Sequence, residues 1–176
     1  VQDDEGRAQF ANYASNDPSE SGKANQLLLS SKLQNTVGNL LKNSNFEEDI
    51  VWAAASDATR TITTEEAYLG SKSLKYTKLS TKTLGGIVSG GFPVKSGETY
   101  TFSAYVKTGA NANVWLSLGP DATKKSETLG AGIPWTRIQM SYTNNTSADV
   151  TCYARVLSDA PGPVYVDCAQ LEQAET

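Results

Sequence analysis

The stretch Tyr100-Thr-Phe-Ser-Ala-Tyr-Val-Lys107 decides the fold of this protein. Two sets of side chains alternate along it: Tyr100, Phe102, Ala104 and Val106 on one side, and Thr101, Ser103, Tyr105 and Lys107 on the other. A period of two places the apolar set on one face of a strand and the polar set on the other. The stretch therefore predicts a β-strand with one buried face and one solvated face.

The same alternation recurs on the C-terminal side, over 135–142 and 150–157. A last strand is expected over 164–171, after the turn Ser158-Asp-Ala-Pro-Gly-Pro163, and should pair antiparallel with its predecessor. Gly, Asn and Pro turns separate these short segments at intervals of about ten residues, which is typical of an all-β sandwich.

Composition restricts the classes of function. The chain has 176 residues, 39% hydrophobic and 19% charged, which fits one folded domain with a short extension. A net charge of -4 without a Lys/Arg block disfavours a nucleic-acid or anionic-membrane partner. No apolar run approaches the ~20 residues that a membrane span needs. Because Val1 stands where a Met would begin a gene product, we expect a fragment of a longer chain, with flanking domains.

The absence of His excludes many catalytic classes. It removes the commonest general base, the Ser-His and Cys-His nucleophile pairs and every His-ligated metal site. Two Cys residues cannot form a structural zinc site, and no Gly-rich phosphate loop is present. A carboxylate-pair hydrolase stays open as an alternative, with the cluster Asp57, Glu65 and Glu66 near a Trp.

Residues 1–37 differ from the rest of the chain, because Asp, Asn, Ser and Gly dominate and no strand pattern appears. They are interpreted as a linker or extension before a domain over 38–176. A four-residue spacing relates Leu29, Leu33, Val37 and Leu41, which favours a short helix. Such a helix either lies against the next domain or binds a partner.

Five segments in order resemble carbohydrate-binding modules of families 4, 9 and 22, over about 39–172. They are Asn39-Leu-Leu-Lys-Asn-Ser-Asn-Phe-Glu47, Ala67-Tyr-Leu-Gly-Ser-Lys-Ser-Leu74, Ser96-Gly-Glu-Thr-Tyr-Thr-Phe-Ser-Ala-Tyr-Val-Lys107, Trp135-Thr-Arg137 and Val164-Tyr-Val-Asp-Cys-Ala-Gln-Leu-Glu172. The extension Asp3-Asp-Glu-Gly-Arg7 also resembles the Tyr-Asp repeat of RHS-type bacterial surface proteins, with Gln2 or Asp3 in place of the Tyr.

The resemblance implies a galactose-binding-like β-sandwich jelly roll of two antiparallel sheets. It implies a non-catalytic module that docks a larger secreted or surface protein, extracellular and bacterial, onto a polysaccharide or oligosaccharide. A neutral or weakly charged glycan is expected, because the chain has no basic block. The alternative is a structural or protein-interaction domain of the same fold without a sugar site.

The resemblance also implies a structural calcium ion. Carried over residue by residue, its ligands are Glu47, Asp167 and the carbonyl near Lys72. Calcium takes six to eight oxygens, and it would relieve the repulsion between two carboxylates brought together by the chain ends.

The candidate carbohydrate-binding residues are those expected on a solvated face: Trp115, Tyr105, Tyr153, Arg155 and Gln139. Aromatic rings stack on the C–H faces of sugars, and amides bind their hydroxyls. In the alternative, Trp115 packs under a loop. A second candidate site lies at the loop edge near Trp52, Asp57 and Arg60. Apart from that alternative, we expect both Trp52 and Trp135 to pack in the core.

Two smaller features complete the expectations. Cys152 and Cys168 are expected on neighbouring strands, either bonded to each other or, as we favour, as buried thiols. The triplet Asn144-Asn-Thr146 matches a glycosylation acceptor, but a polar turn is the preferred interpretation.

Overall fold

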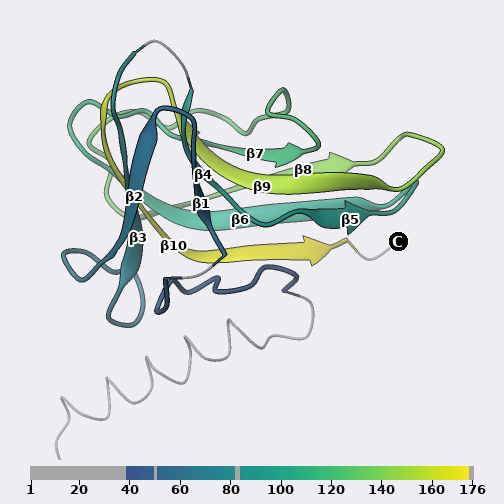
Figure 1. The fold of residues 1–176 in the computed structure, drawn as a ribbon, viewed down its shortest axis with the longest axis horizontal. Helices are drawn as coiled ribbons and strands as arrows, with labels where there is room; N and C mark the ends of the chain where they lie inside the picture. Colours follow the sequence, from purple (N-terminus) through teal and green to yellow (C-terminus); the bar gives the residue numbers. More distant parts are fainter. Residues whose placement is uncertain (1–38, 50, 82–83, 175–176) are drawn as a thin grey trace, which may run out of the picture.

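Two antiparallel β-sheets pack face to face in the computed structural model, which describes residues 39–49, 51–81 and 84–174. Within these ranges every regular element is a strand. The long strands β6, β9 and β10 run along the molecule, and β2 and β3 rise at one end (Figure 1). The predicted all-β sandwich is confirmed.

Sheet I has the order β1-β4-β9-β5, and β7 also pairs with β9. Its strands are β1 (Ala53–Ala55), β4 (Gly85–Val88), β5 (Phe92–Val94), β7 (Trp115–Gly119) and β9 (Val150–Ser158). Its glycine-containing strand β4 approaches β9 closely, because a Cβ on Gly86 would lie 2.0 Å from the carbonyl oxygen of Val156. Only glycine fits there.

Sheet II has the order β2-β3-β10-β6-β8. Its strands are β2 (Ala58–Thr63), β3 (Ser73–Lys78), β6 (Thr99–Thr108), β8 (Thr136–Thr143) and β10 (Gly162–Gln173). The last strand lies between β3 and β6, so the prediction that it pairs with its predecessor is wrong. The Pro-Gly turn instead carries the chain from sheet I into sheet II.

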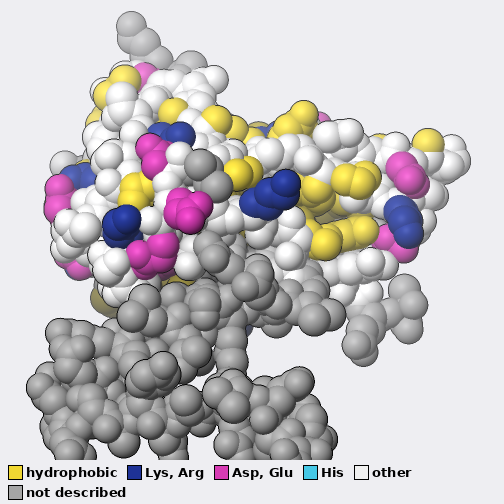
Figure 2. Space-filling model, turned by 60° about the horizontal axis from the view of Figure 1, so that its bottom comes forward, with side chains coloured by type: hydrophobic (Ala, Val, Ile, Leu, Met, Phe, Trp, Pro, Cys, Tyr) yellow, Lys and Arg dark blue, Asp and Glu magenta, His cyan; other side chains and the backbone are white. Residues whose placement is uncertain are grey.

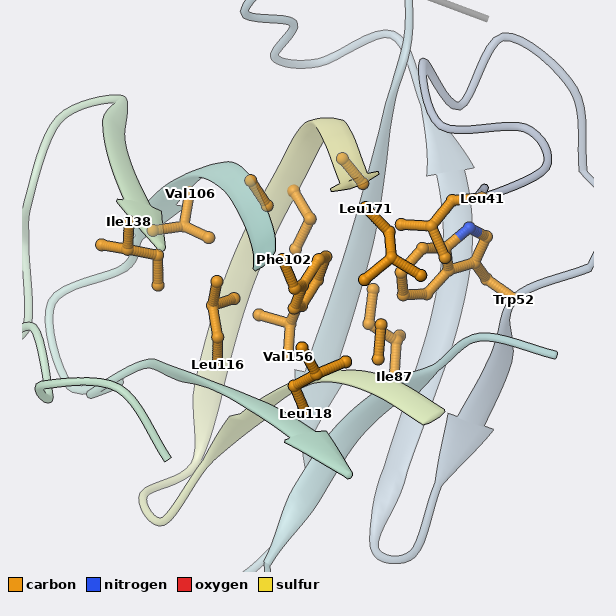
Figure 3. Packing of buried hydrophobic residues seen from close by; sticks show 14 of the residues in the cluster. Leu41, Trp52, Ile87, Phe102, Val106, Leu116, Leu118, Ile138, Val156 and Leu171 are labelled. Atoms are coloured by element: carbon orange, nitrogen blue, oxygen red, sulfur yellow. The ribbon is translucent and has the colours of Figure 1, made fainter. Parts of the chain in front are cut away.

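The apolar faces of the two sheets form one core (Figure 3). Phe102, Val106 and Leu171 of sheet II face Leu116, Leu118 and Val156 of sheet I. The predicted alternation of β6 is confirmed, because its apolar set is buried and its aromatic and polar set faces outward. Trp52 is 1% exposed, as expected for a core residue, and packs edge-on against Phe46 with ring centroids 5.4 Å apart.

The segment 39–49 lies along β10 (Figure 1). Leu40 donates its main-chain N–H to the carbonyl of Leu171 at 2.9 Å, and the Asn39 side chain accepts the N–H of Leu171 at 3.1 Å. Leu41 is buried in the core. The other members of its predicted helical stripe, and the predicted linker 1–37, lie outside the described residues.

Charged side chains of both signs are interspersed on the face shown in Figure 2. The described residues contain no helix that is long and apolar enough to cross a membrane.

Candidate functional site

Three aromatic side chains gather on the outer face of sheet II. Tyr105 points outward from β6, and Tyr68 stacks on it with ring centroids 3.6 Å apart and planes inclined by 14°. Trp135, the residue immediately before β8, has its ring centroid 6.0 Å from that of Tyr68, at an interplanar angle of 59°. Tyr68 is 42% exposed. We call these three residues the aromatic platform.

The segment 64–72 carries Tyr68 across the outer face of sheet II. Glu65 accepts hydrogen bonds from Lys75 of β3 at 2.7 Å and from the hydroxyl of Tyr165 of β10 at 3.0 Å. Glu66 pairs with Lys107 of β6 at 2.6 Å. Outward-facing polar residues of three strands therefore hold the segment in place. The alternation of these strands leaves the polar residues outside the core, where the segment can bind to them.

Asp167 of β10 holds the segment on the side that faces the sheet. Its carboxylate accepts the main-chain N–H groups of Tyr68 at 2.9 Å, Leu69 at 3.0 Å and Cys168 at 2.7 Å. The side chain has 0% exposure because it lies under the segment. Burial raises the pKa of Asp167 to about 6, and the three N–H groups partly offset that increase. A β-bulge follows, with Cys168 at φ 48°, where β10 shifts its register against β6.

Glu47 fixes the other end of the segment. Its carboxylate accepts the main-chain N–H groups of Ser71 at 2.9 Å and Lys72 at 3.2 Å, and the Ser71 hydroxyl at 2.8 Å. The Lys72 ammonium group donates to the main-chain carbonyl of Glu47 at 2.9 Å. Residues from the first and last parts of the described chain thus hold one segment.

In this structure the expected calcium ligands Glu47 and Asp167 accept hydrogen bonds from donors of the chain itself. Calcium requires six to eight oxygen ligands, whereas the atoms that converge on Glu47 and Asp167 are N–H and O–H donors. The main-chain N–H of Lys72 donates to the Glu47 carboxylate, and the Lys72 ammonium group supplies a positive charge nearby. Within 39–49, 51–81 and 84–174, no three His, Cys, Asp or Glu residues gather as a metal-binding group. Calcium binding by this chain stays a prediction from the resemblance.

The predicted carbohydrate-binding residues do not share one surface. Tyr105 and Gln139 face outward from sheet II, where Gln139 pairs with Ser103 of β6. Tyr153, Arg155 and Trp115 belong to sheet I, on the opposite side of the sandwich. The prediction of a single five-residue surface is therefore wrong. Alternation distinguishes inward from outward positions, but it does not say on which sheet an outward residue lies.

The three residues on sheet I have structural contacts. The Arg155 guanidinium donates to the carbonyls of Asp121 at 2.7 Å, Gly119 at 3.2 Å and Pro120 at 3.2 Å, and it lies over the Tyr153 ring. Trp115 is 4% exposed, with the Lys125 ammonium group 5.3 Å from its ring centroid. It points away from the core, as expected, but a loop covers it.

Polar side chains surround the aromatic platform. Arg137 lies opposite Tyr105 on β8, is exposed, and donates from Nη2 to the Ser103 hydroxyl at 3.0 Å. Gln139 is also exposed. The hydroxyl of Tyr105 and burial raise the pKa of Tyr68, while the nearby charge of Arg137 opposes that shift. Rings, amide and guanidinium together suit a flat, hydroxyl-rich ligand.

Sequence reasoning missed Tyr68 and Arg137 as site residues and placed Trp135 in the core, although Trp135 is only partly buried. Tyr68 lies outside every strand, so no periodicity marked it. The signal available was its place in a resembling segment, two residues before Gly70. At Gly70 a φ of 83° turns the chain back toward β3.

The second candidate site, at the loop edge, is not available as predicted. Trp52 is buried and donates its indole N–H to the carbonyl of Lys42 at 3.3 Å. Asp57 is paired with the buried Lys78 at 2.7 Å, and Arg60 with Asp49. The carboxylates considered for a hydrolase, Asp57, Glu65 and Glu66, are each paired with a lysine.

Two further expectations concern buried residues. Cys152 and Cys168 are free and buried, as favoured, but they lie on strands of different sheets rather than on neighbours. Asn144 has 0% exposure; its amide donates to the carbonyls of Val94 and Ala148, and its oxygen accepts the N–H of Thr146. The triplet is a polar turn, and its Asn is not accessible to a modifying enzyme.

The sandwich fold, the aromatic platform on one sheet and the family match that follows identify a non-catalytic polysaccharide-binding module. A model of the carbohydrate binding domain family matches residues 38–162, and the chain belongs to that family. The match stops where β10 begins, although this strand lies at the centre of sheet II. No curated protein sequence matches the chain.

Solved structures share the fold. A xylan-binding domain of family 22 is 20% identical, with a TM-score of 0.59 over 80% of this chain and 98% of that one. The CBM22-1 xylan-binding domain of Xyn10C from Paenibacillus barcinonensis is 21% identical, with a TM-score of 0.57 over 76% and 93%. TmCBM61, in complex with β-1,4-galactotriose, is 13% identical, with a TM-score of 0.52 over 77% and 99%. The galactose-binding-like jelly roll is thereby confirmed.

Proposed function

We propose that the aromatic platform binds the chain of a β-1,4-linked polysaccharide of the xylan class, with Gln139 and Arg137 binding its hydroxyls. The observation that carries this proposal is the stack of Tyr68 on Tyr105, which leaves Tyr68 partly exposed on the surface. A supported, exposed ring is the surface that a pyranose ring contacts through its C–H face.

The supporting residues keep the platform in one orientation before any ligand binds. Tyr68 is held by its main-chain N–H on Asp167, and its ring lies on Tyr105. Rigid aromatic rings lose little conformational entropy on binding, so more of the stacking energy remains as affinity. Shallow, wet contacts nevertheless lose energy to displaced water, so a modest affinity is expected.

The xylan class is suggested by two relatives of the same fold that are described as xylan-binding domains. A third is described in complex with β-1,4-galactotriose, which shows that β-1,4-linked ligands occur on this fold outside the xylan class. Another relative carries its CBM22-1 and GH10 modules in one chain, complexed with xylohexaose. We propose by analogy that this module is part of a larger extracellular protein and holds that protein on its polysaccharide.

Affinity electrophoresis in gels that contain soluble xylan, β-glucan or galactan tests the site. We expect xylan to retard the wild-type protein, and Tyr68→Ala to lower the affinity about tenfold, as expected for the loss of a stacking ring. Tyr153→Ala is the matched control, since it removes the same side chain from the outer face of sheet I. A loss of retardation in Tyr153→Ala but not in Tyr68→Ala would move the site to sheet I. No retardation by any glycan would favour the structural-domain alternative.

A further inference from the structure

Arg137 is the unpaired cation among the outward-facing basic residues described on the strands of sheet II. Lys75 pairs with Glu65 at 2.7 Å, and Lys107 pairs with Glu66 at 2.6 Å. Arg137 is exposed, and no carboxylate of the described residues lies within ion-pair distance of it. The carboxylates of the segment 64–72 neutralise the two lysines but do not pair with Arg137. The uncompensated positive charge on this face therefore lies at the platform.

The geometry orients this charge toward a ligand. Arg137 lies opposite Tyr105 and two residues after Trp135, so it borders the platform on β8. The bond from its Nη2 to the Ser103 hydroxyl holds the guanidinium against the sheet and uses one of its five N–H groups. The planar fork of an arginine binds carboxylates through two parallel hydrogen bonds, and prior fixation reduces the entropy lost on binding.

We propose that Arg137 binds a carboxylate of the polysaccharide, so that the preferred ligand of the aromatic platform is a glycan bearing uronic acid groups. This inference rests on the proposed function, because it names the ligand class of the same site. The sugar ring that stacks on Tyr68 places a neighbouring uronate within reach of the guanidinium at the platform edge.

The charges around the platform favour isolated carboxylates over a polyuronate chain. At the far edge of sheet II an open hollow beside β2 is lined by Glu47, Glu48, Asp49 and Glu65 together with Lys72, and Asp49 and Glu65 are paired with Arg60 and Lys75. The whole chain carries a net charge of -4. A polymer with a carboxylate on every sugar is repelled by this net negative charge, whereas a neutral backbone with occasional uronate side groups is repelled less and can still bind Arg137.

The test compares glucuronoxylan with the same polymer after reduction of its carboxyl groups to alcohols, by isothermal titration calorimetry at low salt. We expect the reduced polymer to bind the wild type about tenfold more weakly, the usual effect of one hydrogen bond to a charged group. Polygalacturonate is the third ligand and should bind more weakly than glucuronoxylan. Stronger binding of polygalacturonate would overturn the preference for isolated carboxylates.

Variants assign the effect to one residue. Arg137→Gln should bind glucuronoxylan and its reduced form equally. Lys124→Gln removes one exposed charge from a loop on the sheet I side and should keep the wild-type preference. A circular dichroism melt of each variant confirms that it folds.

The two proposals fail differently. Equal binding of both polymers to the wild type, together with loss of binding in Tyr68→Ala, overturns the uronate inference and leaves the platform as the xylan site. A preference for glucuronoxylan that persists in Arg137→Gln also overturns it. Absence of binding to either polymer overturns the proposed function itself.

Discussion

Asp167 accepts the main-chain N–H of Tyr68 at 2.9 Å, although 99 residues separate the two in sequence. The exposed ring of the aromatic platform is thus positioned by a buried carboxylate of the last strand. Because Asp167 has 0% exposure, it cannot contact a polysaccharide itself. Its effect on binding is expected to pass through the segment 64–72.

Replacing this carboxylate should loosen the segment. In Asp167→Asn an amide N–H₂ faces the main-chain donors, so at least one buried N–H loses its partner, at a cost of about 1–3 kcal/mol. We expect a lower melting temperature and weaker xylan binding. In Tyr68→Ala, by contrast, affinity falls with a smaller change in stability. An Asp167→Asn protein with normal affinity would show that the platform does not depend on this bond.

The pH dependence of stability provides a separate test of Asp167. Burial raises its pKa to about 6 in the folded protein, above the ordinary value of 3.8 that the unfolded chain should retain. Between these values the folded state binds more protons than the unfolded state, so this residue makes stability decrease as pH rises. The stability difference between the wild type and Asp167→Asn should therefore narrow from pH 4 to 7 in urea titrations with EDTA. A widening difference would contradict the buried, desolvated environment.

Calcium removal tests the resemblance against the observed contacts. If hydrogen bonds from the segment 64–72 satisfy Glu47 and Asp167, the melting temperature should be the same in EDTA and in millimolar calcium. A bound ion would instead raise it with calcium concentration, through mass action. A calcium-dependent increase that disappears in Glu47→Gln would establish the site that the resemblance implies and show that these contacts rearrange on binding.

The sequence predicted well those features that depend on strand periodicity. The inward and outward residues of β6 follow directly from its alternation, because one face packs in the core and the other faces outward. Burial of Trp52 and the two free thiols was also anticipated. Such features are local, since each depends on which face of one strand a side chain occupies.

Features that depend on the partner of a strand were not predictable in this way. The turn before β10 has the composition of a hairpin turn, but the strand crosses to the other sheet, and this separates Cys168 from Cys152. The outward residues Gln139 and Arg155 carry the same local pattern yet lie on opposite sides of the sandwich. Tyr68 reaches its place through long-range hydrogen bonds to Asp167, which no local pattern indicates.

A Trp115 variant distinguishes the aromatic platform on sheet II from the site predicted from the sequence, which included Trp115. It is 4% exposed beneath Lys125, so Trp115→Ala removes a buried side chain and should cost about 3–5 kcal/mol of stability. Below its melting temperature the variant should retain xylan affinity, because the aromatic platform lies on the other sheet. Loss of affinity without loss of stability would return the binding site to sheet I.

Tyr76 supports a final prediction, on the alkaline limit of stability. Its hydroxyl is fully buried on β3 and has no hydrogen-bond partner among the described residues, and neither has the hydroxyl of its neighbour Ser158. Burial strongly raises the pKa of Tyr76. The unfolded chain therefore releases this proton near pH 10 while the folded protein keeps it, so stability decreases as pH rises above about 10.

Tyr76→Phe should be at least as stable as the wild type at pH 7, because it removes a buried hydroxyl without a partner, and should lose less stability between pH 9 and 11. Urea titrations of both proteins across this range provide the measurement, and parallel losses would place the alkaline sensitivity elsewhere, for example in the buried thiols of Cys152 and Cys168.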